Sequence, residues 1–439
     1  MSQNKLIYIE TYGCSANQNN SEILAGLLTS SGFQITNNKE IADTVILNTC
    51  IVKNKTENKI KRKIQDQSKT KQLTIITGCM PDTDSKNIKQ LNPKALLLGT
   101  KHLKSIVKTI QDKESTLSIL NNSDNTINHN KEKEEKILLP KIPLNNLISI
   151  TQISEGCLSN CTFCKTKLSK GNLHSYTQEK IIRSIKNDLE AGAKEIWLTS
   201  QGNGCYGMDR GSRELPELLT KILSLPHRFK LRLGMMNPQH VPPILNQLLE
   251  IYKNKKMYKF IHLPIQSASN KILKDMKRPY KIEEVNQIIK LFKDSFPNIT
   301  IATDIITGYP TETETDHQLN LNFITKHKPN ILNLSKFSKH KNTQAQSLKE
   351  LPIETLNKRN SEIMRQHRNT ASENKQHFKN QTLKVLVNKK TYLENIYEAR
   401  DENYNIILIK SKDKSILGKT IEVKITKLGV HHMIGEILE

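Results

Sequence analysis

Three cysteines fall within one short run, Cys157-x-x-x-Cys161-x-x-Cys164. A loop this short can bring three thiolate sulfurs to one point, where they can hold an iron–sulfur cluster. Such clusters take four ligands as a rule, so three cysteines leave one iron open to bind a substrate or cofactor. The spacing predicts a catalytic cluster on these three residues. The alternative is a structural zinc ion with its fourth ligand from Cys205 or His174, although zinc sites usually come as paired C-x-x-C units.

A second group of three cysteines is spread over the first part of the chain. Cys14, Cys50 and Cys79 each follow a short apolar run typical of a buried strand. Those runs are residues 5–13, 43–49 and 73–78. Because the carboxyl ends of parallel strands meet at one edge of a sheet, we expect the three thiols to lie close together. Alone, each would be an ordinary buried cysteine. Together they predict a second metal cluster, again with one iron open.

The remaining cysteine and the start of the chain bear on the redox compartment. Cys205 lies in a Gly-rich loop and is expected to be a thiol that binds no metal. The first residues show no secretory signal, and no run approaches the roughly 18 apolar residues that cross a bilayer. Thiols of a long chain without a signal are better explained as metal ligands than as disulfides. We therefore predict a cytoplasmic protein without a membrane segment.

The charge of the chain favours a polyanionic partner. Its 439 residues hold 67 Lys and Arg against 43 Asp and Glu, a formal net charge of +24. Basic residues concentrate in two stretches, 53–71 and 321–379. Such an excess is typical of proteins that bind RNA or DNA, while a solvated lysine-rich surface is the plainer alternative.

The apolar patterns predict an α/β chain in three domains. Residues 1–120 alternate strands and helices, including a strand at 95–99 and a helix at 20–32, as in an open parallel sheet. Residues 121–146 are polar and aperiodic, which is typical of a linker. Residues 147–379 form the second predicted domain and 380–439 the third.

Six strand patterns separated by helices predict a partial (βα)6 barrel, open on one side, in the second domain. The strands are expected at 147–154, 195–201, 231–236, 259–266, 300–308 and 331–337. The helices include 176–193, 280–296 and a basic one at 354–379. In the tail, alternating patterns predict strands at 382–390, 403–411, 418–426 and 433–439, a small all-β module of OB-like style. Its tyrosines could stack on bases or fill the barrel; they are Tyr392, Tyr397 and Tyr404.

Residues after the barrel strands are candidates for cofactor contact, because this architecture places its chemistry at strand carboxyl ends. The candidates are Gln201, Gly202, Gln266, Ser267, Gly308 and Pro310. A capping box from Thr311 to Glu314 is expected to open the next helix. His262 is expected to be a satisfied core histidine.

The motifs together resemble a known family, the radical-SAM methylthiotransferases. The run EGCLSNCTFC (155–164), with Phe163 beside the last cysteine, resembles the cluster loop of radical-SAM enzymes. The first domain shares the family's cysteine motifs TYGCSANQNNSE (11–22), NTCIVKNKTENK (48–59) and TGCMP (77–81). Further similar segments are SKGNLHSY (169–176), LTSQGNGCYG (198–207), LRLGMMNPQHV (231–241), HLPIQSASNKILKDMKRPY (262–280) and DIITGYPTETETD (304–316). The resemblance covers nearly the whole chain and is nearest to the archaeal and eukaryotic branch.

This resemblance implies cofactors, a substrate and a site. It implies two 4Fe–4S clusters, on Cys14, Cys50 and Cys79 and on the catalytic trio Cys157, Cys161 and Cys164. It implies S-adenosylmethionine at the barrel mouth, reductive cleavage of that cofactor with electrons from an outside donor, and sulfur delivery from the first-domain cluster. The implied substrate is tRNA carrying N6-threonylcarbamoyladenosine at position 37, and the tail corresponds to the family's RNA-binding TRAM domain.

Two departures from the family pattern concern substrate and cofactor contact. Lys170 stands where the family usually has arginine, and residues 339–345 lack the usual Pro-Gly before Thr343. Arginine and lysine are not interchangeable where a planar fork is needed.

Three other functions stay open at this point. A relative could modify isopentenyladenosine in tRNA, or a ribosomal protein. From a different class, a non-enzymatic iron–sulfur or zinc protein could bind tRNA without consuming S-adenosylmethionine.

Overall fold

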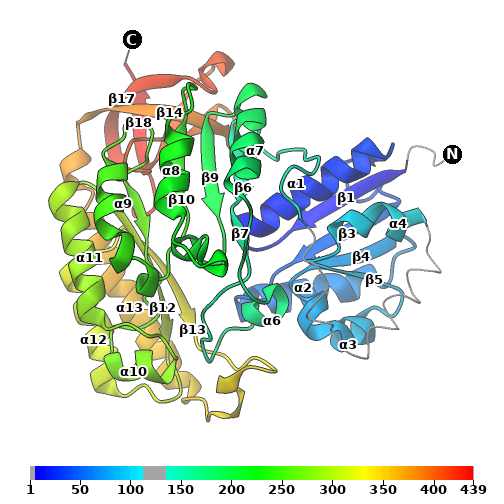
Figure 1. Cartoon of the computed structure of the whole chain (residues 1–439), viewed down its shortest axis with the longest axis horizontal. Coiled ribbons are helices and arrows are strands. Elements are labelled where there is room, and N and C mark those ends of the chain that lie inside the picture. Colours follow the sequence, from blue (N-terminus) through cyan, green and yellow to red (C-terminus); the bar gives the residue numbers. More distant parts are fainter. Residues whose placement is uncertain (1–4, 112–134, 439) are drawn as a thin grey trace. The chain divides into compact units, whose positions relative to one another are not determined.

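The computed structural model describes residues 5–111 and 135–438 of the chain (Figure 1). The chain divides into two compact units. Unit 1 comprises residues 1–144, 150–157 and 164–184, and unit 2 comprises residues 145–149, 158–163 and 185–439. Within the described ranges, no helix is both long enough and apolar enough to cross a bilayer.

Unit 1 is built on a parallel sheet with the strand order β2-β1-β3-β4-β5. The strands are β1 (Leu6–Thr11), β2 (Gln34–Ile35), β3 (Thr44–Thr49), β4 (Leu73–Gly78) and β5 (Leu96–Gly99). The helices are α1 (Ser15–Ser30), α2 (Asn54–Gln67), α3 (Pro81–Leu91) and α4 (Ile106–Gln111). Every residue of β3 is buried, and apolar side chains pack in two separate clusters around the sheet. The predicted open parallel α/β sheet is confirmed; the short edge strand β2 was not foreseen.

The helix predicted at 20–32 begins earlier, at Ser15. Its first turns carry asparagines, which are more typical of a loop, but these side chains are buried and bonded. Asn17 donates to the carbonyl oxygens of Tyr12 (2.9 Å) and Thr49 (2.8 Å), and Asn19 donates to Ile150 O (2.8 Å). Tertiary hydrogen bonds thus extend a helix whose local sequence is polar.

The predicted linker 121–146 lies partly outside the described residues, which resume at residue 135. The part that is described packs on α1. Ile142 N donates to Glu22 O (2.9 Å), and a Cβ built on Gly26 would overlap the carbonyl of Pro140, so helix and segment lie in close contact. Lys136 is buried and forms an ion pair with buried Glu155 (2.5 Å).

The central strands follow one another along the chain with helices between them. They are β6 (Ile148–Gln152), β9 (Glu195–Thr199), β10 (Lys230–Leu233), β11 (Phe260–His262), β12 (Thr300–Thr307) and β13 (Ile331–Lys336). They form two three-stranded sheets, β10-β9-β6 and β11-β12-β13. The segments of β10 and β11 are joined by the isolated bridge from Leu231 to Met257 and by the backbone hydrogen bond from Met236 N to His262 O (2.9 Å), not by a continuous ladder. The six predicted strands therefore form two sheets and not one. A two-stranded pair joins β7 (Ser154–Glu155) to β8 (His174–Ser175).

The connecting helices match most of the predicted ranges. They are α6 (Thr166–Lys170), α7 (Gln178–Glu190), α8 (Leu215–Leu223), α9 (Leu245–Tyr252), α10 (Asn270–Asp275), α11 (Ile282–Ser295), α12 (Glu314–His327) and α13 (Ile353–Glu373). The predicted capping box was wrong by two residues. Thr313, not Thr311, caps α12, and Asp316 closes the box. Thr311 instead donates to Asp275 Oδ2 (2.5 Å).

The tail of unit 2 is a closed five-stranded barrel with the order β14-β15-β16-β18-β17. Its strands are β14 (Thr382–Lys390), β15 (Ile396–Arg400), β16 (Ile406–Lys410), β17 (Thr420–Leu428) and β18 (Met433–Ile437). Only β16 and β18 pair in parallel. The strand β15 was missed in the sequence, whereas the other four lie in or near their predicted ranges.

An aromatic cluster joins this tail to the central strands. Tyr404 packs with Tyr258 and Phe260, and its ring centroid lies 4.9 Å from each of theirs. The carboxylate of Glu195, fully buried, accepts hydrogen bonds from the side chains of Tyr258 (2.5 Å) and Asn388 (2.7 Å). The tail is therefore fixed where β9 and β11 begin.

Candidate active site

Unit 1 brings its three cysteines to one edge of the sheet. Cys14 follows β1 and caps α1, Cys50 follows β3, and Cys79 follows β4. These strands are neighbours in register, with Thr11 opposite Asn48 and Thr49 opposite Gly78. The three thiols accordingly lie past the carboxyl ends of three adjacent strands.

The backbone next to Cys14 is shaped for close approach. Gly13 has a φ of +109°, and a Cβ built there would lie 2.9 Å from the sulfur of Cys50. A side chain at Gly13 would therefore collide with a thiol of the trio. The glycine lets the turn after β1 pass directly over the turn after β3.

The three thiols differ in burial and acidity. Cys14 is exposed, whereas Cys50 and Cys79 are each 5% exposed. Burial raises the pKa of Cys50 to about 11, and the nearby sulfurs of Cys79 and Cys14 act in the same direction. Burial also raises the pKa of Cys79, against the influence of the Lys170 cation. The two buried thiols are protonated at neutral pH until a metal binds them, because the thiolate is the ligand form.

Asn17 holds the cysteine-bearing turns together, and the sequence did not single it out. Its amide nitrogen bonds to carbonyls at the ends of two strands, as described above. Its Oδ1 lies 4.0 Å from the sulfur of Cys79. An asparagine three residues after a cysteine in a polar run gives no local sign of this role.

The other trio lies on the loop after β7, at 157–164, and all three cysteines are partly exposed. Within unit 1, Cys157 N donates to Gly171 O (3.1 Å), and Lys167 donates to the carbonyl of Cys157. Within unit 2, the Arg278 guanidinium donates to the sulfur of Cys161 (3.5 Å). Backbone and cationic contacts therefore hold the loop at its start and in its middle.

In unit 2 the middle of this loop is also anchored by Thr162. Its hydroxyl lies 2.9 Å from the hydroxyl of Tyr309, and its N–H donates to Met276 O (3.2 Å). The next residue, Phe163, packs against an apolar cluster that contains Tyr309 and Met276. Tyr309 belongs to the Gly-Tyr-Pro turn, so the cluster loop and this turn pack together.

Arg278 is the most informative residue that sequence reasoning missed. It is 7% exposed and also donates to Pro264 O (2.8 Å) and to the hydroxyl of Tyr280 (3.2 Å). Tyr280 and the Cys161 sulfur raise its pKa although burial opposes its charge. Arg278 lies in the segment KDMKRPY, which is part of a motif shared with the family, so the segment could have been singled out. Nothing in the local sequence shows which of its lysines or arginine is buried against the cysteine loop.

The predicted cofactor-contact residues all follow strand carboxyl ends in unit 2. Gln201 and Gly202 follow β9, Gln266 and Ser267 follow β11, and Gly308 and Pro310 follow β12. Gln266 has a φ of +69° and exchanges backbone hydrogen bonds with β12, from Gln266 N to Asp304 O (2.8 Å) and from Ile306 N to Gln266 O (2.9 Å). Ser267 is fully buried and accepts from Ser269 N (3.2 Å). Gly308 N donates to the buried carboxylate of Glu312 (3.1 Å).

Two further residues have partners that bear on their expected roles. The thiol of Cys205 is buried and donates to Gly202 O (3.0 Å). His262 Nε2 bonds to a carboxylate oxygen of Asp304, and its side chain is 14% exposed. The histidine thus has the partner expected of a satisfied residue, although it is not fully buried.

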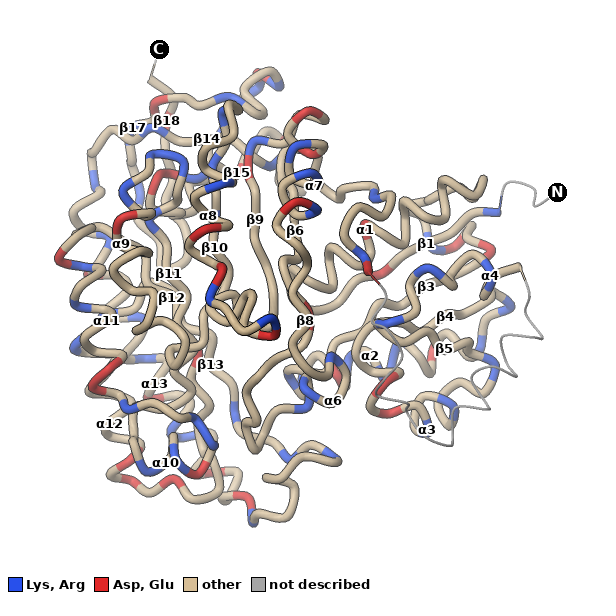
Figure 2. The backbone as a smooth tube through the Cα atoms, in the orientation of Figure 1, with Lys and Arg blue, Asp and Glu red and all other residues tan. Residues whose placement is uncertain are grey.

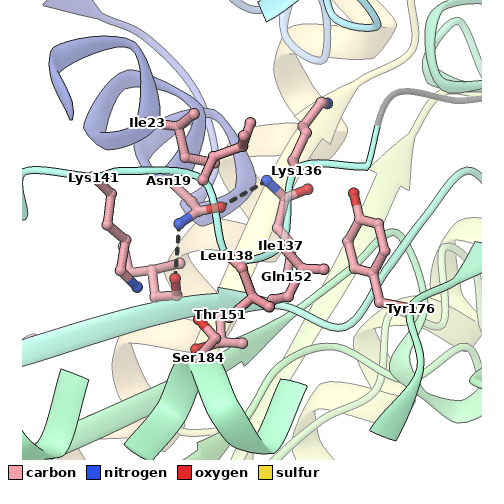
Figure 3. Close-up of a pocket in the computed structure, with 12 residues that line it drawn as sticks. Asn19, Ile23, Lys136, Ile137, Leu138, Lys141, Thr151, Gln152, Tyr176 and Ser184 are labelled. Carbon is pink, nitrogen blue, oxygen red and sulfur yellow. Dashed lines mark hydrogen bonds between the residues drawn. The ribbon is translucent and has the colours of Figure 1, made fainter. Parts of the chain in front are cut away.

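Within the described ranges, no three or more His, Cys, Asp or Glu side chains, those of the two cysteine trios included, lie closely enough together to hold a single metal ion. Unit 1 holds a small cavity of about 20 Å³ beside α1 and β6, bordered by Asn19, Lys136, Gln152 and Tyr176 (Figure 3). Gln152 donates to Asn19 Oδ1 (3.0 Å) across it. None of the six cysteines lines this water-sized space.

Each unit has a helix rich in lysine and arginine, α2 in unit 1 and α13 in unit 2 (Lys and Arg are blue in Figure 2). In unit 1, α2 carries Lys55, Lys59, Lys61, Arg62 and Lys63. In unit 2, α13 carries Lys358, Arg359, Arg365 and Arg368. Arg359 is not available to a ligand, because it pairs with buried Glu312 (2.9 Å).

Comparison with known proteins identifies the family. Residues 6–99 match the family described as Uncharacterized protein family UPF0004, and residues 151–324 match the Radical SAM superfamily. A relative from Pyrococcus horikoshii, named probable threonylcarbamoyladenosine tRNA methylthiotransferase, is 34% identical over 98% of this chain and 99% of its own length. The chain belongs to the radical-SAM methylthiotransferase family.

Relatives from archaea and eukaryotes place the chain on the branch expected from its motifs. The human threonylcarbamoyladenosine tRNA methylthiotransferase is 32% identical over 98% of this chain and 73% of its own. The chain also shares its fold with a solved radical S-adenosylmethionine methyltransferase, TsrM from Kitasatospora setae. The TM-score is 0.55 at 12% identity, over 78% of this chain and 74% of that one. The Radical SAM match implies S-adenosylmethionine and a 4Fe–4S cluster as cofactors.

Proposed function

We propose that this chain converts N6-threonylcarbamoyladenosine at position 37 of tRNA to its 2-methylthio derivative. The observation that carries the proposal is near full-length similarity to relatives named for this activity, in a chain that has both cysteine trios. Both trios lie on loops that follow strands. One trio follows three strands of a parallel sheet, and the other follows the first of the central strands.

Six cysteines are proposed to hold two 4Fe–4S clusters. Cys14, Cys50 and Cys79 would ligate the cluster of unit 1, and Cys157, Cys161 and Cys164 the other one. When bound, the cluster on Cys157, Cys161 and Cys164 would supply the electron that cleaves S-adenosylmethionine. The cluster on Cys14, Cys50 and Cys79 would supply the sulfur. The donor set fits, because each trio offers three thiols and leaves one iron open. An outside electron donor must supply the electrons, and a second S-adenosylmethionine must supply the methyl group.

The chain's own residues orient the reacting groups. Arg278 fixes the sulfur of Cys161, and the contact between Thr162 and Tyr309 fixes the loop against the Gly-Tyr-Pro turn. Packing of Phe163 against the apolar cluster anchors the loop beside Cys164. The residues proposed to contact S-adenosylmethionine, from the ends of three strands, are Gln201, Gly202, Gln266, Ser267, Gly308 and Pro310.

The tail barrel and the basic helices are proposed to hold the tRNA. The strand order of the tail, closed on itself with one parallel pair, supports its assignment as an OB-like TRAM domain. Of its tyrosines only Tyr392, which is 97% exposed, can stack on a base. Tyr397 and Tyr404 are buried and fill the core instead. A tRNA-modifying enzyme with these features would act in the cytoplasm.

The test starts from anaerobic reconstitution with iron and sulfide. We expect about eight irons per wild-type chain, and about four in the triple variant Cys157→Ala/Cys161→Ala/Cys164→Ala. Cleavage of S-adenosylmethionine should vanish in that variant. In Cys14→Ala/Cys50→Ala/Cys79→Ala it should persist, because the cluster that cleaves the cofactor is intact.

Nucleoside mass spectrometry then decides the substrate. In a tRNA that carries threonylcarbamoyladenosine with an unmodified C2, the nucleoside should gain the mass of a methylthio group less that of the hydrogen it replaces, and only with the wild-type chain. Gain on isopentenyladenosine tRNA instead would replace the proposed substrate. One tightly bound zinc, or cleavage that survives loss of Cys157, Cys161 and Cys164, would refute the enzymatic function and favour plain tRNA binding.

A further inference from the structure

Two side-chain amides of unit 2 contact the cysteine loop 157–164. They belong to the segment 237–240, which follows β10. Nδ2 of Asn237 donates to the hydroxyl oxygen of Ser159 (2.9 Å), and Nε2 of Gln239 donates to the same oxygen (3.1 Å). Ser159 lies between the first and second cysteines of the loop. Because both amides bond to one atom, they lie side by side against this loop.

A neutral histidine fixes the orientation of the Gln239 amide. Nε2 of Gln239 lies 2.7 Å from Nε2 of His240. Burial lowers the pKa of His240 to about 4, and the cations of Arg213 and Arg278 act in the same direction. A neutral imidazole has one acceptor nitrogen, which the Gln239 amide supplies with an N–H. Both hydrogens of that amide are therefore used, on Ser159 and His240, and its oxygen points away from both.

The oxygens of the two amides lack hydrogen-bond donors. Oδ1 of Asn237 and Oε1 of Gln239 are buried, and neither accepts a hydrogen bond from any residue that the structure describes. Asn237 is 7% exposed, whereas Gln239 is partly exposed, so the pair lies at the edge of the interior. A buried acceptor without a donor is destabilising, because it has lost water and gained nothing in return. Two such oxygens side by side point to a ligand that brings two donors.

The position of the amides ties this ligand to the reacting end of the substrate. Ser159, to which both amides bond, is on the loop proposed to hold the cluster that cleaves S-adenosylmethionine. Arg278, whose charge acts on neighbouring His240, donates to the sulfur of Cys161 on that loop (3.5 Å). A group bound by the amides is therefore held beside the proposed radical chemistry.

A ureido group offers the donors that these oxygens lack. In N6-threonylcarbamoyladenosine, the carbamoyl carbon links N6 of adenine to the nitrogen of threonine, so an N–H lies on each side of one carbonyl. Isopentenyladenosine has one N–H, at N6, and an apolar tail in place of the second. Unmodified adenosine offers N6 alone. Two neighbouring acceptors thus match the threonylcarbamoyl nucleoside and stay partly unpaired with the other two.

We propose that Asn237 and Gln239 recognise the ureido group of N6-threonylcarbamoyladenosine, each accepting one of its N–H groups through the side-chain oxygen. This inference rests on the proposed function and names residues that select its substrate. Ser159 and His240 hold the two amides in the required orientation by accepting their N–H groups. A nucleoside without the second N–H is rejected because it leaves a buried acceptor unpaired.

The experiment measures affinity for three anticodon stem-loop RNAs of one sequence. Position 37 is N6-threonylcarbamoyladenosine, isopentenyladenosine or adenosine, and binding to the reconstituted full-length chain is followed by fluorescence anisotropy without S-adenosylmethionine. Asn237→Leu and Gln239→Met remove an acceptor at nearly constant size, whereas Asn237→Asp keeps one. Gln247→Met is the matched control, because Gln247 is exposed on α9, which follows the same segment.

We expect the wild-type chain to bind the threonylcarbamoyladenosine RNA about a hundredfold more tightly than the adenosine RNA, from about tenfold for each hydrogen bond. Asn237→Leu and Gln239→Met should each lower this preference about tenfold and leave the affinity for the adenosine RNA unchanged. Asn237→Asp adds a negative charge, so it should weaken binding of all three RNAs equally and keep the preference. Gln247→Met should change neither affinity nor preference.

A preference that survives in both Asn237→Leu and Gln239→Met would overturn the inference. An equal loss of affinity for all three RNAs in these variants would overturn it too, because such a loss assigns the amides a structural role. Mass spectrometry of the wild-type product separates this inference from the proposed function. If the wild-type chain converts the tRNA and the variants keep its preference, only the role of Asn237 and Gln239 falls. If the wild-type chain converts no threonylcarbamoyladenosine, both fall together.

Discussion

Replacing Arg278 by methionine is expected to loosen the loop around Cys161 while keeping most of the side chain's apolar stem. The guanidinium donates to Pro264 O (2.8 Å), to the Tyr280 hydroxyl (3.2 Å) and to the Cys161 sulfur (3.5 Å). Methionine cannot donate at all, so a buried carbonyl and a buried hydroxyl lose a partner. Lysine can replace only one of these bonds, because it lacks the planar fork.

The size of the effect follows from burial. Hydrogen bonds to a charged group contribute about 1.5–3 kcal/mol each, and the two short bonds of Arg278 are almost fully desolvated. The cost of burying the charge, which methionine does not have, offsets part of this. We expect Arg278→Met to lower the unfolding free energy of unit 2 by about 2–4 kcal/mol, and Arg278→Lys by roughly half as much.

The assay uses urea unfolding followed by fluorescence. The chain has a single tryptophan, and Trp197 lies on β9, so its emission reports unit 2 alone. Arg210→Met is the matched control: Arg210 pairs with Glu214 (2.6 Å) and lies over the Tyr206 ring, but a third of its side chain is exposed. A surface pair of this kind contributes about 0–1 kcal/mol.

Iron loading gives a second readout in the Cys14→Ala/Cys50→Ala/Cys79→Ala background. Arg278→Met should load less iron than its parent, and Arg210→Met should load the same amount. Equal, small losses of stability in both arginine variants would refute the reasoning about desolvated hydrogen bonds. Unchanged iron loading in Arg278→Met would show that the guanidinium does not position Cys161.

Gly308→Ala should lower stability by about 2–4 kcal/mol and weaken S-adenosylmethionine binding, measured by calorimetry, because Gly308 has a φ of +73° and a Cβ there would overlap Leu356. Burial raises the pKa of Asp401 from 3.8 to about 6, so the folded state binds the proton more tightly than the unfolded state. Stability should therefore fall by up to about 3 kcal/mol as pH rises through that window, and Asp401→Asn should remove the slope in urea unfolding at several pH values. Glu195→Ala should cost roughly 3–5 kcal/mol by the tryptophan assay, since it strips the acceptor from three buried or half-buried donors; an effect below about 1 kcal/mol would contradict its anchoring role.

The sequence alone was enough to place the cysteines and the main elements. Short apolar runs followed by cysteine predicted the strands β1, β3 and β4 and put their thiols at one edge, because parallel strands share their carboxyl ends. The same logic located the candidate cofactor-contact residues after β9, β11 and β12. These features depend on local periodicity and spacing, which a single chain displays directly.

Features that depend on distant partners needed the tertiary structure. The first turns of α1 look like a polar loop until Asn17 and Asn19 find carbonyl partners on and beside strands. The strand β15 has only five residues, two of them the charged Glu398 and Arg400, and it becomes a strand because its neighbours pair with it on both sides. Tyr404 becomes core because the ends of the central strands cover it.

The difference between what the sequence predicts and what only the folded structure decides is clearest for the charged residues. The sequence counts lysines and arginines, and most of them are surface residues with no specific role. Only the packed structure turns Arg278 toward a cluster-loop sulfur and buries Lys170 at the end of α6. Burial and the identity of the nearest opposite charge are properties of chain segments brought together by folding. No local pattern encodes them, because the segments that meet are far apart along the chain.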